Sequence, residues 1–231
     1  MISFLSKHKR IIFIVVVVVF IGSIFFVSGQ VFTAASSEAV ADVGGKKIPY
    51  QRFILQVNRV LANFKDSGTE VSEVISKSVK QEVFREMVIE ELLFQQGDKM
   101  AMRVADFEVA VEIQNTPQFA ENGAFNPRLY YQTVYNEFQM SPSAYEAWRK
   151  KARLSGKFKQ FLYTSVKVTP DELKAYYLSK NKSLKDFEKN KDKYLDELSK
   201  DKFSQVANYL LRQLTVQMEI KSYLAEREQG R

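Results

Sequence analysis

A long apolar run close to the amino terminus sets the first limit on how this chain can fold. Residues 11–27 read IIFIVVVVVFIGSIFFV and carry no charged side chain. About 20 apolar residues span the hydrocarbon core of a bilayer as a helix, and lipid leaves the backbone no other hydrogen-bonding partners. The run therefore predicts a transmembrane helix over residues 11–32.

The charges around this run predict its orientation. Lys7, Lys9 and Arg10 precede it, and no acidic residue occurs among the first 32 positions. The positive-inside rule then gives a cytoplasmic tail over residues 1–10 and a periplasmic location for the bulk of the chain. The expected location is the bacterial inner membrane, crossed once. A cleaved signal peptide is the alternative, because Ala39-Val40-Ala41 matches the A-x-A pattern of a cleavage site.

The side-chain inventory excludes most catalytic chemistry. The chain has no cysteine, and its single histidine is His8. Disulfides, thiolate nucleophiles, Cys/His zinc sites and Ser-His-Asp triads are therefore excluded. The net charge of +7 comes from 34 basic and 27 acidic residues, and it is too dispersed for a nucleic-acid binder. We expect no cofactor, no metal, no nucleic-acid partner and no catalytic residue.

Local signals in the first part of the body predict a hairpin followed by amphipathic helices. Short extended segments flank Gly44-Gly45, which is typical of a β-hairpin. Apolar residues then recur every three or four positions from Tyr50 to Phe64, after a proline that can open a helix. A second, longer stripe runs from Val79 to Leu92, and it is widened beyond one face by Ile89, Leu93 and Phe94.

Helix-start signals continue this pattern toward the carboxyl terminus. A shorter helix is expected over residues 106–115, followed by a loop. Three more helix starts are marked by an N-cap residue next to proline: Asn126-Pro127, Ser141-Pro142 and Thr169-Pro170. The fold class predicted for the body is therefore mainly α, with a small amino-terminal β-hairpin.

Composition divides the body into three segments. Residues 33–172 hold the hairpin and the amphipathic helices, and they are predicted to form one helical domain. Residues 173–202 are rich in Lys, Asp and Glu, which favours a charged helical connector. A helical apolar stripe then returns and predicts a long C-terminal helix over residues 203–231.

A group of motifs runs through residues 41–130. ADVGGKKI at 41–48 is followed by EELL at 90–93 and by IQNTPQF at 113–119. The most specific segment is P-x-F-x-x-x-G-x-F-N-x-x-x-Y, from Pro117 to Tyr130. Together these motifs resemble the amino-terminal chaperone domain of the SurA/PpiD periplasmic folding factors. The resemblance covers most of residues 38–175, and it implies that the C-terminal helix completes a SurA-N-like chaperone domain.

The chain also departs from this family. Its members usually carry a parvulin-type prolyl isomerase module, with a pair of histidines in its site, before the last helix. Only residues 173–202 are available for it here, too few for such a module, and the resemblance therefore implies a chaperone without the isomerase. Two smaller departures are Gly97 inside the second helix, which costs about 0.5–1 kcal/mol relative to alanine, and Ala101, where the family more often has a helix-ending glycine.

Aromatic side chains are concentrated between Phe107 and Tyr163. Aromatic and methionine side chains suit a site that accepts many sequences, because they attract apolar groups without strict direction and can repack. Core packing is the alternative, above all for the rings at 119, 125 and 130. The candidate peptide-binding residues are Phe119, Phe125, Tyr130, Tyr135, Phe138, Met140, Tyr145 and Trp148.

A basic stretch overlaps this aromatic segment. Seven basic residues and no acidic residue lie between Ala147 and Pro170. A solvated helix face explains such a stretch most simply. Contact with anionic lipid or with an acidic partner is the alternative.

These observations lead to one hypothesis and two rivals. The hypothesis is an inner-membrane-anchored periplasmic chaperone that binds unfolded or newly exported polypeptides through an apolar helical groove, without catalysis. One rival is a PpiD-like peptidyl-prolyl cis-trans isomerase. The other is a membrane-bound adaptor for a translocon or assembly partner. The expected partners are thus nascent exported polypeptides, the inner membrane and translocon components.

Overall fold

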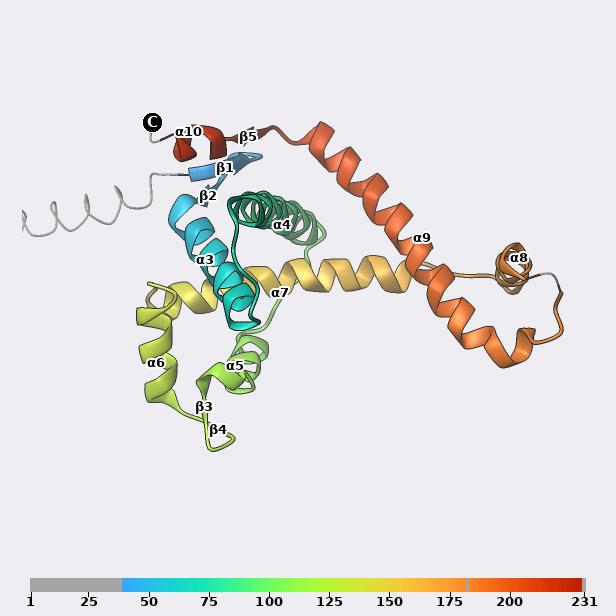
Figure 1. Ribbon diagram of the computed structural model, residues 1–231, viewed down its shortest axis with the longest axis horizontal. Coiled ribbons are helices and arrows are strands. Elements are labelled where there is room, and N and C mark those ends of the chain that lie inside the picture. Colours follow the sequence, from blue (N-terminus) through green and yellow to red (C-terminus); the bar gives the residue numbers. More distant parts are fainter. Residues whose placement is uncertain (1–38, 182, 230–231) are drawn as a thin grey trace, which may run out of the picture.

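A small antiparallel sheet joins the two ends of the part of the chain that the structure describes. The computed structural model describes residues 39–181 and 183–229, drawn as a ribbon in Figure 1. Strands β1 (Ala39–Val43) and β2 (Lys46–Pro49) form the predicted hairpin, and β5 (Ile220–Ser222) pairs with the other edge of β1. Gly44 and Gly45 turn the hairpin at φ 57° and 81°, a left-handed conformation that favours glycine.

The first hydrophobic core lies between this sheet and helices α3 (Tyr50–Asp66) and α4 (Glu73–Lys99). Both helices follow the apolar periodicity of the sequence, and each turns its apolar face to this core. The side chains that are least exposed here come from the sheet and both helices: Val40, Val43, Phe53, Val57, Val83 and Leu92.

A second core forms where α5 (Asp106–Gln114), α6 (Pro127–Asn136) and α7 (Pro142–Ser165) meet. The segment between α5 and α6 is more ordered than the expected loop. It contains the 3-10 turn η1 (Pro117–Phe119) and a small hairpin in which strand β3 (Ala120–Glu121) pairs with strand β4 (Ala124–Phe125). The ring of Phe119 fixes this segment, because it is fully buried in the second core.

The three predicted helix starts are confirmed. The side chains of Asn126 and Ser141 accept hydrogen bonds from backbone N–H groups in the first turns of α6 and α7, and proline is the first residue of each helix. Helix α8 (Pro170–Lys180) begins with a capping box. Thr169 Oγ1 accepts a hydrogen bond from the N–H of Glu172 at 3.2 Å, and Glu172 Oε2 accepts one from the N–H of Thr169 at 2.8 Å.

Helix α9 (Phe187–Gln217) is the longest helix of the described chain, and it runs diagonally past the end of α7 toward the sheet in Figure 1. It begins inside the stretch expected to be a connector, because Phe187, Tyr194 and Leu198 pack with α8 in a third apolar cluster. It ends at Gln217, after which the chain forms β5 and the short helix α10 (Leu224–Glu228).

The expected transmembrane helix is not part of the observed fold. None of the helices within residues 39–181 and 183–229 is long and apolar enough to cross a membrane. The long helices α4 and α9 contain several Lys and Asp side chains, each of which costs about 2.5–3.5 kcal/mol at the centre of a bilayer. The predicted tail, residues 1–10, and the predicted span, residues 11–32, lie outside the described residues.

The fold class is accordingly corrected to a mainly helical fold with a small sheet. The single-pass location in the bacterial inner membrane depended on the transmembrane helix, and that prediction is corrected with it.

The basic stretch of α7 has its acidic partner within the chain. Arg149 binds Glu112, and Arg153 reaches both Glu108 Oε2 at 3.1 Å and Glu112 Oε2 at 3.0 Å. Lys157 Nζ lies 2.6 Å from Glu108 Oε1. The hydrogen bond from Lys157, together with those from the Ala105 N–H and Arg153, lowers the pKa of Glu108 to about 2. These charges therefore hold α5 against α7.

Candidate functional site

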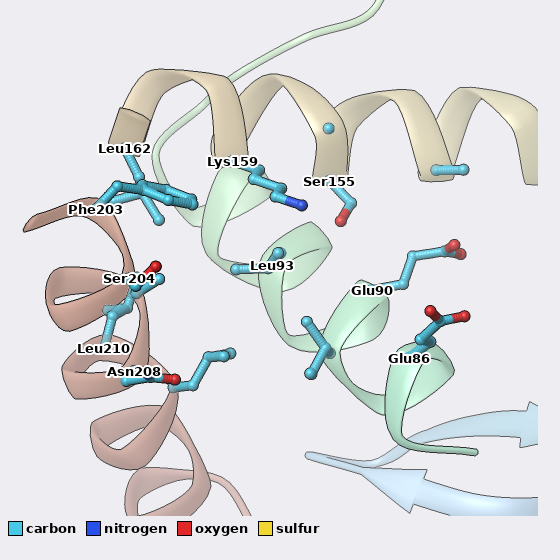
Figure 2. A pocket seen from close by; sticks show the side chains of 15 residues that line it. Glu86, Glu90, Leu93, Ser155, Lys159, Leu162, Phe203, Ser204, Asn208 and Leu210 are labelled. Carbon is cyan, nitrogen blue, oxygen red and sulfur yellow. The ribbon is translucent and has the colours of Figure 1, made fainter. Parts of the chain in front are cut away.

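The main candidate site is an apolar groove bounded by three helices, shown from close by in Figure 2. Its volume is about 510 Å³. Helix α4 contributes Glu86, Ile89, Glu90 and Leu93; α7 contributes Ala152, Ser155, Gly156, Lys159 and Leu162; and α9 contributes Phe203, Ser204, Ala207, Asn208, Leu210 and Leu211. We call this hollow the α4/α7/α9 groove.

The lining of this groove combines nine residues without a polar side-chain group and six polar or charged ones. Figure 2 shows Leu162 and Phe203 at the end where α7 meets α9, and the carboxylates of Glu86 and Glu90 at the opposite end. The Lys159 side chain extends into the space between α7 and α4 in the same view. Most of the lining is therefore apolar, and it offers contact area more than directional hydrogen bonds.

The groove continues beyond this central hollow in both directions along α9. A hollow of about 250 Å³ shares Gly156, Lys159 and Phe203 with it, and another of about 460 Å³ shares Ile89, Asn208 and Leu211. Helix α9 thus borders all three hollows, and neighbouring hollows share part of their lining.

Two features keep the walls of the groove in place. Helices α4 and α7 approach closely at Gly97, where an added Cβ would lie 3.4 Å from Phe158 Cβ and 3.5 Å from Leu154 Cγ. Helix α9 is anchored at its carboxyl-terminal end by Leu214, which is 2% exposed in the first core. A methyl group at position 97 would make ordinary van der Waals contacts, whereas the space between α4 and α7 leaves no room for a larger side chain.

Seven of the eight candidate aromatic and methionine residues lie together in the second core. Four of them are buried: Phe119, Tyr130, Phe138 and Tyr145. Phe125, Met140 and Trp148 are half-buried against them, whereas Tyr135 is 74% exposed on α6. Peptide binding by these residues stays a prediction.

The buried rings meet edge to face, as aromatic rings in cores prefer. Phe119 lies 5.1 Å from Tyr130 and 5.9 Å from Tyr145, measured between ring centroids, and Phe138 lies 4.8 Å from Tyr145. Burial raises the pKa of both Tyr130 and Tyr145, and the Tyr130 hydroxyl donates a hydrogen bond to Glu146. These contacts hold the η1 segment and α6 on the first half of α7.

A second hollow lies at one side of this aromatic cluster, between α3 and α7. Its volume is about 310 Å³, and it is lined by three of the candidates, Phe138, Met140 and Trp148, together with Arg52 and Arg59 of α3. A further hollow of about 630 Å³ lies between α5 and α7, beside the exposed ring of Phe107. Part of the predicted aromatic set therefore borders a cavity, and the rest fills the core.

The walls of the α4/α7/α9 groove were not among the candidate residues. One signal for them exists in the sequence, since Ile89 and Leu93 widen the apolar stripe of α4 beyond the face that one core requires. A helix with apolar residues on two faces needs a second surface to contact. Ala207 and Leu211 line the groove because of where α9 crosses α7 and α4, and no local sequence pattern predicts that crossing.

The acidic residues of the described chain do not assemble a metal centre. Within residues 39–181 and 183–229, no group of three or more His, Cys, Asp or Glu side chains is placed to hold a metal ion.

Comparison with known proteins gives one match to a protein family. The model of the SurA-like N-terminal domain matches residues 1–159, more than half of the 231-residue chain. A search of curated protein sequences finds no match. The family match confirms the resemblance that the motifs between residues 41 and 130 indicated.

Proposed function

Because this chain belongs to the family of the SurA-like N-terminal domain, we propose that it is a chaperone that binds unfolded polypeptide segments in the α4/α7/α9 groove, without catalysis. Family membership supports a chaperone-like role as the general class. The observation that carries the proposal is the mostly apolar hollow between α4, α7 and α9, with two further hollows beside it along α9.

The length of the groove suits a short extended segment. Phe203 and Thr215 border its outer hollows and lie about 18 Å apart along α9, at 1.5 Å per helical residue. An extended chain advances about 3.3 Å per residue, and a client segment that follows α9 past all three hollows would therefore have five or six residues. A folded domain is too wide for this space, which favours clients that lack tertiary structure.

The chemistry of the groove suits clients of varied sequence. Apolar contact stabilises by about 25 cal/mol per Å² of buried area, whatever the order of the side chains. Ala152, Gly156 and Ala207 leave room along the walls, while Leu93 and Leu211 provide apolar surface. The conformational entropy that a flexible client loses on binding offsets much of the free energy gained from apolar contact, and we therefore expect weak binding at each site.

A charge placed in the groove tests this proposal. Ala207 lines the groove on α9, whereas Val216 on the same helix is 85% exposed. We compare the full chain with Ala207→Glu and Val216→Glu, using fluorescence anisotropy with a permanently unfolded, labelled polypeptide. Ala207→Glu should weaken binding about tenfold or more, because a carboxylate would be desolvated beneath the client, and Val216→Glu should leave it unchanged.

The controls separate lost binding from lost folding. Circular dichroism and thermal unfolding must show that both variants fold as the parent does. Suppression of aggregation of a chemically unfolded enzyme, followed by light scattering, should change in parallel with the anisotropy. Absence of binding by the parent chain, or equal binding by both variants, would refute the proposal.

The two rival functions give different results in further assays. A protease-coupled proline peptide assay above background would indicate an isomerase. Crosslinking that captures one discrete folded protein in place of a range of unfolded clients would indicate an adaptor.

A further inference from the structure

The hollow between α3 and α7 brings together three guanidinium groups. Arg52 and Arg59 come from α3, one face of which lines the hollow, and Arg149 comes from α7. Phe138 and Trp148 provide aromatic surface beside them. We call this hollow of about 310 Å³ the arginine pocket.

The positive charge of the arginine pocket is only partly balanced. Arg52 Nη2 lies 2.6 Å from Glu90 Oε1, and Glu90 is the single acidic residue among the lining residues. Arg149 is bound by Glu112, which stands outside the lining and also binds Arg153. The lining itself therefore carries three cationic groups and one carboxylate.

Arg59 has no carboxylate partner among residues 39–181 and 183–229. Its Nη2 donates a hydrogen bond of 3.3 Å to the neutral side chain of Gln118, and its Cζ lies 4.5 Å from the centroid of the Phe138 ring. A guanidinium group with neutral partners only is available to an incoming anion at the edge of the pocket.

Two buried N–H donors of the pocket also lack an acceptor within the described chain. They are Nε of Arg52 and Nε1 of Trp148. The two groups are neighbours, because Arg52 Cζ lies 4.9 Å from the centroid of the indole ring. Buried donors without acceptors are unusual in folded proteins, and a small shift of either side chain would expose its N–H to a ligand oxygen in the pocket.

The chemistry of the lining selects the class of ligand. Three guanidinium groups repel cations, and they form short, charge-assisted hydrogen bonds with oxyanions. The rings of Phe138 and Trp148, with the Met140 side chain, add apolar contact next to these donors. A carboxylate attached to an apolar residue matches both parts of this surface.

The arginine pocket adjoins the α4/α7/α9 groove. Glu90 of α4 borders both hollows, and on α7 Arg149 lies one turn before Ala152 of the groove. A polypeptide in the groove can therefore place a residue in the pocket without leaving the surface of the protein.

We propose that the arginine pocket binds a carboxylate of the polypeptide held in the adjoining groove, so that apolar segments next to an acidic group are preferred clients. The inference rests on the proposed function, since the groove supplies most of the contact area. The carboxylate can be the end of a chain or an acidic side chain, because both present the same two oxygens.

Fluorescence of the full chain tests this inference, because Trp148 is its only tryptophan. The probes are three versions of one acetylated heptapeptide of Leu, Val, Phe and Ser: with a free carboxyl terminus, with a terminal amide, and with a terminal amide plus glutamate as the last residue. The free acid should bind about tenfold or more tightly than the amide, as expected for hydrogen bonds to a charged group, and should shift the Trp148 emission. The glutamate peptide shows whether a side-chain carboxylate serves equally.

Substitution of Arg59 provides the matched variant. Arg59→Gln should reduce the ratio of the free-acid affinity to the amide affinity toward one, while the affinity for the amide stays unchanged. Arg128→Gln removes the same charge from an exposed residue outside the pocket, and it should preserve the ratio. High salt should also reduce the ratio, because ions screen the attraction.

The possible failures are distinguishable. Equal binding of free acid, glutamate peptide and amide, with no change in Trp148 emission, would overturn the carboxylate preference and leave the groove in place. A preference that survives Arg59→Gln would overturn the role of this pocket. Absence of binding by any peptide would refute both this inference and the proposed function.

Discussion

The substitution Leu214→Ala tests how the outer wall of the groove is held. Leu214 lies near the carboxyl-terminal end of α9 and is one of only two buried residues within that helix. It is 2% exposed and belongs to the core shared by the sheet, α3 and α4. If this anchor fails, α9 and the strand that follows it lose their attachment to the body.

The expected loss of stability follows from the burial of this side chain. Leu214→Ala removes three carbon atoms that are almost fully buried, which at about 0.8 kcal/mol each gives a transfer loss of about 2.4 kcal/mol. The cavity left behind adds to this value, and buried leucine-to-alanine substitutions generally cost about 2–5 kcal/mol. We therefore expect the free energy of unfolding to fall by about 3 kcal/mol.

Urea unfolding followed by circular dichroism measures this loss. The control is Leu195→Ala, the same change on the same helix at a residue that is 38% exposed, for which the same scale gives a loss of about 1.5 kcal/mol at most. Hydrogen exchange locates the effect, because the amides of β5 that pair with β1 should lose protection in Leu214→Ala. Binding of the unfolded polypeptide should weaken in parallel.

Two results would refute this reasoning. Equal destabilisation by Leu214→Ala and Leu195→Ala would mean that α9 is not anchored at its carboxyl-terminal end. A large loss of stability with unchanged protection of β5 would mean that the residue supports the core but not the position of α9.

Four further substitutions, at three positions, test the packing and the charges of the body, each by urea unfolding. Gly97→Ala should stabilise by about 0.5–1 kcal/mol, because a methyl group fits beside Leu154 and the helix loses its glycine, whereas Gly97→Leu should destabilise by about 1–3 kcal/mol through overpacking. Ala101→Gly should stabilise by about 1 kcal/mol, because residue 101 has φ 56° at the end of α4. Glu108→Gln should lower stability at pH 7 and flatten its decline in acid: the folded pKa is about 2 because of Lys157, and the stabilisation present above about pH 4.5 is lost as the pH falls toward 2.

Local signals in the sequence predicted the elements well. The hairpin at Gly44 and the three helix starts depend on contacts within a few residues, and all four are observed. The position of Ala101 is a further example. The resemblance indicated that a helix-ending glycine is usual there, and Ala101 does have a left-handed backbone conformation. Its N–H donates a hydrogen bond to the carbonyl of Asp98, and the N–H of Met102 donates one to the carbonyl of Gly97.

The groove could not be predicted in the same way. Its walls come from residues near 90, 156 and 207, and the surface exists only after α9 has crossed α7 and reached α4 (Figure 1). The aromatic-rich segment gave a different expectation because large rings suit both a core and a binding surface. The edge-to-face contacts of Phe119, Tyr130 and Tyr145 show that most of this aromatic area is used for packing.

The attachment of α9 supports the proposal that the groove accepts different clients. Its two buried residues, Phe187 and Leu214, lie about 40 Å apart along the helix, one in the cluster with α8 and the other in the first core. The part between them is half-buried or exposed, and Ala207 and Leu210 there face the groove. A wall that is fully buried only near its carboxyl-terminal end and half-buried along the groove can move by small amounts while Leu214 stays in the first core. Larger and smaller client side chains can then be accommodated at similar free energy, which is what binding of many sequences requires.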